Sequence, residues 1–373
     1  MSTKPASNAK PSVGEIRAHM PKDRHGNSTN KALSLFIPNA LLYVLSFLAV
    51  IFVPSWPIKV LCASLNSVFI ATLFILGHDA CHGSLTPSRK INDVLGRLAF
   101  LPSLHPFSAW ELGHNRLHHG WTNLRDKDYG YTPLSKQEFD NLPAYRQMLE
   151  RIYRTVGGVG LYYLIEIWWK HMMVPRQTDM EKMNRAFKLD RLLVVGFTIT
   201  QVAALIYATI HFSVPASPLL LVLLAVVWPY MLWNWIIAFV TFQHHTHPSV
   251  TWYANKDEWS FFHGQVQGTI HVTFSRPIEL IFHNILEHTA HHVDPKIPLY
   301  NLRASQQVLE EVYADDVIVQ KGSIPHFHRV LTKCKLYDYE NYQWLDFNGN
   351  PTSKQAITAE QKRQVKDAAS VQT

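Results

Sequence analysis

The sequence predicts an all-α integral membrane protein with four transmembrane helices arranged as two hairpins. Of the 373 residues, 47% are hydrophobic and only 17% are charged, whereas about a quarter of the residues of soluble domains are charged. Four long apolar runs interrupt the more polar sequence. The chain also has 21 histidines, and many of them gather near the ends of these runs, which predicts a metal site beside the membrane.

The four apolar runs cover about residues 33–53, 58–77, 192–212 and 218–242. A helix needs about 20 residues to cross a hydrocarbon core of roughly 30 Å, so each run is long enough. Short uncharged links, 54–57 and 213–217, join the runs in pairs. We therefore expect a loosely ordered N-terminal segment at 1–32 and a main domain at 33–310. A C-terminal extension at 311–373 should follow, ending in a disordered tail.

Nearly all charged residues lie before the first run, between the second and third, and after the fourth. The positive-inside rule then places the N-terminus, the C-terminus and the histidine clusters on the cytoplasmic side. Lys59, near the outer end of the second span, is expected to extend its amine to the interface. The net charge of +7 follows from this topology. No basic stripe with stacking aromatics is present, so we expect no nucleic-acid partner.

Three histidine clusters are the main functional signal. They are His78-Asp-Ala-Cys-His82, His114-Asn-Arg-Leu-His118-His119 and His288-Thr-Ala-His291-His292. Spacings of three and four residues place imidazoles on one helical face, so each cluster can offer several ring nitrogens to one point. The cysteines, Cys62, Cys81 and Cys334, are far apart and form no CxxC pair, which excludes a disulfide scaffold and a cysteine-based metal site.

Eight imidazoles are too many for one zinc ion, which takes three or four protein ligands. Two ions with four or five ligands each fit the number. The first cluster has Asp79 where a zinc protease of the HExxH type has its glutamate, so this class is disfavoured. Imidazole also suits iron. We therefore predict two non-haem irons that bind O₂ as co-substrate between them.

The motifs HDACH, HNRLHH and HTAHH resemble the three histidine boxes of the membrane fatty-acid desaturases. The segments 106–114 (PFSAWELGH) and 122–131 are similar to the surroundings of the second box in the Δ12/ω-6 type branch. Residues 241–248 (TFQHHTHP) resemble the TYLQHTHP stretch of that branch, and 282–302 continue the similarity. The resemblance covers roughly residues 35–310.

This resemblance implies four membrane helices beneath a cytoplasmic helical cap that holds the di-metal site. It implies an enzyme that inserts a cis double bond into an acyl chain bound to lipid, CoA or acyl carrier protein. The chain would enter a hydrophobic tunnel, and a separate ferredoxin, rubredoxin or cytochrome b5 type protein would supply electrons. A ninth ligand is expected after the fourth span, where His247 is preferred and His245, beside His244, is the alternative. The full predicted ligand set is His78, His82, His114, His118, His119, His247, His288, His291 and His292.

Metal-bound imidazoles usually donate their second nitrogen to a carboxylate or carbonyl oxygen. The candidates for this role are Asp79, Asn115, Asp128, Glu287 and Asp294, with Asp79 preferred; helix capping or exposure to solvent is the alternative for each. Trp110 lies four residues before His114 and could line the substrate channel, although core packing would explain it equally well.

Other functions remain open at this stage. The same scaffold could serve a hydroxylase, an acetylenase, or a carotenoid or alkane oxygenase. A metal transporter or a metal-binding membrane protein is the non-enzymatic alternative. A transporter, however, needs polar ligands inside its spans, whereas these clusters lie at or beyond the predicted span ends.

Overall fold

The computed structural model describes residues 10–175 and 185–356. These residues are mostly helical, which confirms the predicted fold class. The helices are α1 Val13–His19, α2 Thr29–Phe52, α3 Trp56–His82, α4 Arg89–Phe100, α5 Phe107–Trp110, η1 Glu111–His118, α6 His119–Trp121, α7 Lys136–Asp140, α8 Ala144–Tyr153, α9 Val159–Tyr162, η2 Tyr163–Met173, α11 Arg185–His211, α12 Pro218–Val222, η3 Leu223–Val227, α13 Trp228–His245, η4 Lys256–Glu258, α14 Phe261–Gln265, α15 Arg276–Ile281, α16 His288–Val293, η5 Leu299–Asn301, α17 Leu302–Val312 and α18 Ile324–Lys333.

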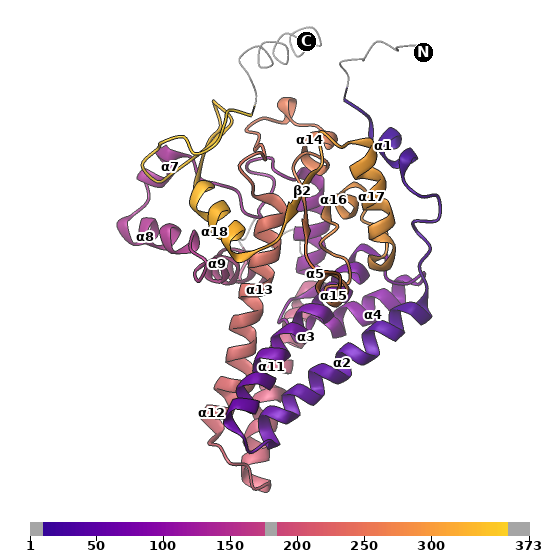
Figure 1. Cartoon of the computed structure of the whole chain (residues 1–373). Coiled ribbons are helices and arrows are strands. Elements are labelled where there is room, and N and C mark those ends of the chain that lie inside the picture. The colour runs from indigo at the N-terminus through magenta and orange to yellow at the C-terminus, as the bar shows by residue number, and fades with distance from the viewer. Residues whose placement is uncertain (1–9, 176–184, 357–373) are drawn as a thin grey trace.

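Within the described residues, four helices are long and apolar enough to cross a membrane, as predicted. They are α2, α3, α11 and a continuous helix from Pro218 to His245 that comprises α12, η3 and α13. Figure 1 shows them as a bundle below a larger cap. The second and fourth extend a few residues beyond the predicted runs, to His82 and His245. These extensions carry histidines from the bundle into the cap.

α3 is the central helix of the bundle. In its most apolar stretch 61% of the residues are buried, against 22% for α2 and 17% for α11. The outward faces of α2 and α11 expose large apolar side chains such as Leu45 and Leu192, which suit contact with lipid tails. α3 packs against α2, α4 and α13. It is therefore fixed on several sides, and its C-terminal histidines start from a rigid base.

Lys59 does not extend to the interface as expected. Its side chain is fully buried, and its Nζ donates to the carbonyls of Val50 and Ile51 at 2.6 and 2.9 Å. These carbonyls belong to the last turn of α2, where no helical N–H is available to them. A cation at this end also interacts favourably with the helix dipole. Lys59 therefore ties the two helices of the first hairpin together.

The part of the N-terminal segment that is described is ordered, contrary to the expectation for 1–32. Ser12 and Glu15 form a capping box at the start of α1, and Ile16 is fully buried. Arg17 Nε donates to the carbonyl of Val293 at 2.9 Å, at the end of α16. The segment is ordered because it packs against α16 and α17; residues 1–9 lie outside the described part.

Short strands occur where only helices were expected. β1 (Ile270–Thr273) pairs in parallel with β2 (Ile318–Lys321), and β3 (Leu336–Asp338) pairs with antiparallel β4 (Gln343–Leu345). The strands after residue 310 are part of the cap and not of a separate extension. Trp344, for example, is buried and donates from Nε1 to the carbonyl of Val250 at 3.2 Å. The predicted disordered tail falls mainly on 357–373, outside the described residues.

Candidate metal centre

Among the described residues, two groups of histidines could each hold a metal ion. Within each group, one ring nitrogen of every member lies within 4.8 Å of those of the other members. The five-histidine group is His78, His82, His114, His119 and His291. The four-histidine group is His118, His245, His288 and His292. The structure thus brings together all eight histidines of the three clusters and adds His245 to them.

Several ring nitrogens within each group lie about as far apart as ligands of one metal ion. His78 Nε2 is 2.8 Å from His114 Nε2, which is 3.1 Å from His119 Nε2. In the other group, His245 Nε2 is 3.1 Å from His118 Nε2 and 2.9 Å from His288 Nε2. Nitrogens that each lie about 2.1 Å from one shared ion are separated by roughly 3 Å. The spacing therefore fits ligands that converge on a metal.

Two further nitrogens support this fit. Among the described residues, the buried Nε2 atoms of His82 and His292 have no hydrogen-bond partner. A buried polar atom without a partner destabilises a fold, unless a metal ion occupies the place of the partner. Because every donor is an imidazole nitrogen, the groups suit a transition metal such as iron and not Mg²⁺ or Ca²⁺, which prefer oxygen.

Both groups consist of histidines from remote parts of the chain. His78 and His82 end α3, His245 ends α13, and three more lie on the short helix α16. Consecutive residues are divided between the groups: His118 from His119, and His291 from His292. The two candidate sites are therefore adjacent, because the peptide bonds 118–119 and 291–292 each link a ligand of one group to a ligand of the other.

The second cluster uses a π-helix to supply both groups. In an α-helix His119 would point about 140° away from His114, because five residues exceed one turn. In η1 the His119 backbone N–H instead donates to the His114 carbonyl, which is the i→i+5 bond of a π-helix. This wider turn brings His119 toward the side of His114. A regular α-helix was expected here from the histidine spacing.

Two predicted supporting carboxylates lie against histidines of the groups. Asp128 Oδ1 is 2.9 Å from His118 Nδ1, and Asp128 also accepts from the backbone N–H groups of Asn123 and Gly130. Asp79 Oδ1 is 3.3 Å from His78 Nδ1, and its Oδ2 accepts from the Leu299 N–H at 2.7 Å. The contact of Asp128 is the shorter one, although Asp79 was preferred from the sequence.

Among the described residues, the side chains of the other predicted supporting residues form no hydrogen bond or ion pair with a histidine of either group. Asn115 donates to the Cys81 carbonyl at 2.9 Å, and so braces the end of α3. Glu287 precedes α16, where burial raises its pKa to about 7. Asp294 accepts from Arg24 at 2.9 Å and contacts His25 at 2.7 Å, so it fixes the N-terminal segment.

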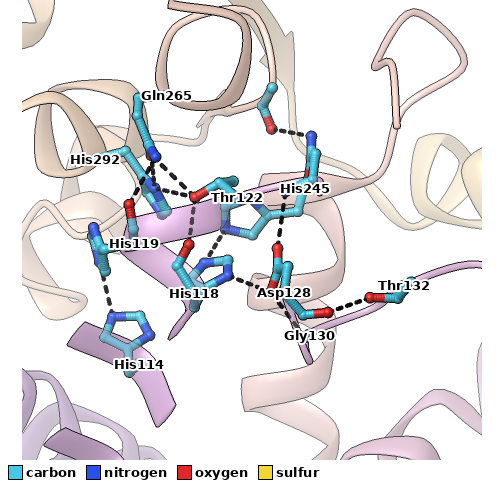
Figure 2. Close-up of polar contacts among 12 residues, drawn as sticks. His114, His118, His119, Thr122, Asp128, Gly130, Thr132, His245, Gln265 and His292 are labelled. Carbon is cyan, nitrogen blue, oxygen red and sulfur yellow. Dashed lines mark hydrogen bonds and ion pairs between the residues drawn. The ribbon is translucent and has the colours of Figure 1, made fainter. Parts of the chain in front are cut away.

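Gln265 and Thr122 also support the four-histidine group, although neither was predicted as a supporting residue. Figure 2 shows Gln265 beside His292, with its Oε1 2.7 Å from the Nδ1 of that ring. Gln265 Nε2 donates to the His119 carbonyl at 2.8 Å, so one amide contacts both groups. Thr122 Oγ1 donates to the His118 carbonyl at 2.7 Å. An amide in a helix has no motif that would distinguish it in the sequence.

The preference for His247 as the ninth histidine is corrected by the structure. His247 lies beyond the end of α13, where its Nδ1 accepts from the Ser249 N–H at 3.1 Å and its ring lies near His326. His245, the alternative, is the last residue of α13 and lies in the four-histidine group. His244 stacks on His288 with ring centroids 3.8 Å apart. Because α13 ends at His245, His247 lies outside the helix and belongs to neither histidine group.

Burial favours the neutral form of five of the histidines in the two groups. It lowers the pKa of His114, His119, His288, His291 and His292 well below the ordinary histidine value, and the neighbouring imidazoles lower it further. A neutral imidazole has a free lone pair, whereas a protonated one has none. At neutral pH these rings are therefore ready to bind metal.

A narrow apolar cavity of about 90 Å³ adjoins both groups. Phe74, Tyr131, Trp233 and Ile237 line it together with five histidines of the groups. Trp110 also lines it and stacks on His114, with ring centroids 4.6 Å apart. Trp110 therefore packs in the protein core and also lines the cavity, so both interpretations of this residue describe its position.

The match to a family model and the similarity to individual proteins point to the same family. The family model described as fatty acid desaturase matches residues 54–322. The chain is 27% identical over 329 residues to the chloroplastic omega-6 fatty acid desaturase of Spinacia oleracea, covering 88% of this chain and 70% of the relative. It is 26% identical over 331 residues to the sn-1 oleoyl-lipid 12-desaturase of Synechocystis, covering 88% and 89%.

Proposed function

This chain belongs to the fatty acid desaturase family and is a fatty-acyl desaturase, and we propose that it inserts a cis double bond by means of two irons held by nine histidines. The five-histidine group would hold one iron and the four-histidine group the other. The observation that carries the proposal is the convergence of these nitrogens, together with the orphaned Nε2 atoms of His82 and His292.

When bound, the two irons would supply the activation of O₂ that removes two hydrogens from adjacent methylenes. The two broken C–H bonds supply two electrons and two protons, the external donor supplies two electrons, and two further protons come from solvent. Together these reduce O₂ to two waters as the C=C bond forms. The electron donor would be a separate protein of the ferredoxin, rubredoxin or cytochrome b5 type.

The residues of the chain orient the metal ligands and exclude water. Asp128 accepts from the Nδ1–H of His118 and so turns its Nε2 inward; Gln265 does the same for His292. Such partners fix the ring orientation and raise the basicity of the ligand. Phe74, Trp110 and Trp233 close the apolar cavity around the histidines, where an acyl chain would lie. A dry cavity also protects reactive intermediates from side reactions.

We propose that the substrate is an oleoyl lipid. The second double bond would form at the 12 position of the oleoyl chain. The support is the naming of the relatives as omega-6 fatty acid desaturase and sn-1 oleoyl-lipid 12-desaturase. The cap and both ends of the chain would face the cytoplasm, because the basic residues concentrate on that side of the spans. Membrane lipids would surround α2 and α11, whose apolar faces are exposed.

The deciding experiment is expression in a host whose lipids contain oleate but no polyunsaturated chains. We expect a diunsaturated product by mass spectrometry, two irons per purified chain, and no product from a His118→Ala variant. Hydroxylated or alkynyl chains without new alkenes would instead indicate the hydroxylase or acetylenase function. Metal binding without any O₂-dependent oxidation of lipid would favour the transporter alternative and contradict the proposal.

A further inference from the structure

A second candidate site lies on the surface of the cap, outside the two histidine groups. It is a cavity of about 430 Å³ between the end of α8, the segment that follows it, α18 and the loop after β4. Its lining includes the cations Arg151, Arg154 and Lys335, together with His328. Among the residues that the structure describes, no acidic side chain lines the cavity. This concentration of positive charge would suit an anion.

Arg154 is the residue that needs a partner. Only 7% of it is exposed, and its buried Nε has no hydrogen-bond partner among the described residues. The ring faces of Phe242 and Tyr162 lie 5.5 and 5.8 Å from its guanidinium carbon, but rings do not neutralise a charge. Glu150, one turn earlier, is close enough to attract both Arg146 and Arg154, but its ion pair at 3.4 Å is with Arg146. The guanidinium of Arg154 therefore has a charged neighbour but a buried N–H without an acceptor, which is costly.

The other two cations are free of carboxylates. Among the described residues, neither Arg151 nor Lys335 forms an ion pair, and both lie over the ring of Phe347, at 4.7 and 5.4 Å from its centroid. These ring contacts fix the positions of the two side chains. A preorganised set of cations binds an oxyanion with little loss of side-chain entropy.

The position of α8 indicates where the anion would come from. Tyr145, Met148 and Ile152 occupy one stripe of this helix and are 66%, 60% and 36% exposed, at the spacing of a single helical face. In Figure 1, α8 lies across the direction of α13 at the lower edge of the cap, where the bundle begins. An apolar stripe flanked by arginines is typical of a helix lying in the lipid headgroup region.

We propose that the cavity formed by Arg151, Arg154 and Lys335 binds the phosphate of an anionic membrane lipid. The apolar stripe of α8 would lie in the upper part of the lipid layer, and the phosphate would neutralise the buried guanidinium of Arg154. Tyr162 lies between this site and the apolar cavity, because it stacks on Tyr131 with centroids 4.7 Å apart. This inference stands without the proposed function, since it requires no metal.

The test uses the full-length protein in an uncharged detergent and measures thermal unfolding while the short-chain lipid dihexanoyl phosphatidylglycerol is added. We expect saturable stabilisation of the wild type. Arg154→Gln should weaken the apparent affinity about tenfold or more, since it removes charge-assisted hydrogen bonds. In case this variant folds poorly, the double variant Arg151→Gln, Lys335→Gln removes only surface cations and should weaken binding similarly.

Two further ligands and one control variant make the outcome decisive. Arg329→Gln removes an exposed cation of α18 that does not line the cavity, and it should bind as the wild type does. Dihexanoylglycerol, which lacks the phosphate, should stabilise little. Equal stabilisation by inorganic phosphate would overturn the lipid as the source. Unchanged affinity in both cavity variants would overturn the site itself.

Discussion

The five-histidine group and the four-histidine group differ in how their rings are supported from outside. In the four-histidine group, His118 contacts Asp128 at 2.9 Å and His292 contacts Gln265 at 2.7 Å. In the five-histidine group, the carboxylate contact of His78 with Asp79 is longer, at 3.3 Å. Among the described residues, the Nδ1 atoms of His119 and His291 in this group have no hydrogen-bond partner, and in the four-histidine group the same holds for His245 and His288.

This difference indicates two ways of holding a metal. Hydrogen bonds from outside orient two of the four rings of the smaller group, His118 and His292, so these two supports should matter. The larger group has one more ligand, and its rings pack edge to face against one another, as His82 does with His114 and His119. It should therefore tolerate the loss of one ligand better.

The largest effect is expected from removing a ligand. His118→Ala and His82→Ala should both abolish the product, but they should differ in metal content. His118→Ala leaves three ligands in its group and should lose that iron, whereas His82→Ala leaves four and should retain more of its iron. Metal analysis of purified protein measures this difference. His211→Ala, at the far end of α11, is the control; greater iron loss in His82→Ala would refute the distinction.

A chelator should remove iron from the two histidine groups at different rates. We expect a strong iron chelator to remove metal in two phases, with the smaller group emptied first, and the melting temperature to fall because a bound metal stabilises the fold. The time course of iron release and the unfolding curve of the same samples provide the measurement. A single phase would mean that the two groups hold metal equally well.

The supporting carboxylates offer a matched pair of variants. Asp128→Asn should reduce activity or iron affinity by about 10–100-fold, the usual effect of removing such a partner. Asp79→Asn should have a smaller effect on iron, because its contact with His78 is long and its Oδ2 mainly accepts from Leu299. Turnover and iron titration are compared for the two. A larger loss of iron in Asp79→Asn would reverse the comparison.

The smallest effect is expected at Gln265. Gln265→Leu removes the acceptor beside His292 and the bond to the His119 carbonyl, and should lower activity about tenfold at most, at the low end of the range for such supports. Gln265→Glu keeps an acceptor for His292 and should recover part of the activity. If both variants behave as the wild type, packing alone holds His292 in place.

The spans and the three histidine clusters could be predicted because each leaves a local pattern in the sequence. Apolar length predicts a membrane helix, and histidines three to five residues apart predict converging ligands. The choice of His245 over His247 could not be predicted, because it depends on where α13 ends. The π-helix of η1 and the support from Gln265 depend on tertiary packing. The burial of Lys59 depends on the angle of the first hairpin.

The division of two adjacent pairs, His118 with His119 and His291 with His292, links the occupancy of the two sites. Consecutive Cα atoms are 3.8 Å apart. Binding of an ion to one histidine group therefore also immobilises backbone that carries ligands of the other group. The second ion then meets ligands that have already lost their conformational freedom, which favours its binding. Once the first ion is lost, the ion that remains should therefore be held less tightly than it is in the fully loaded chain.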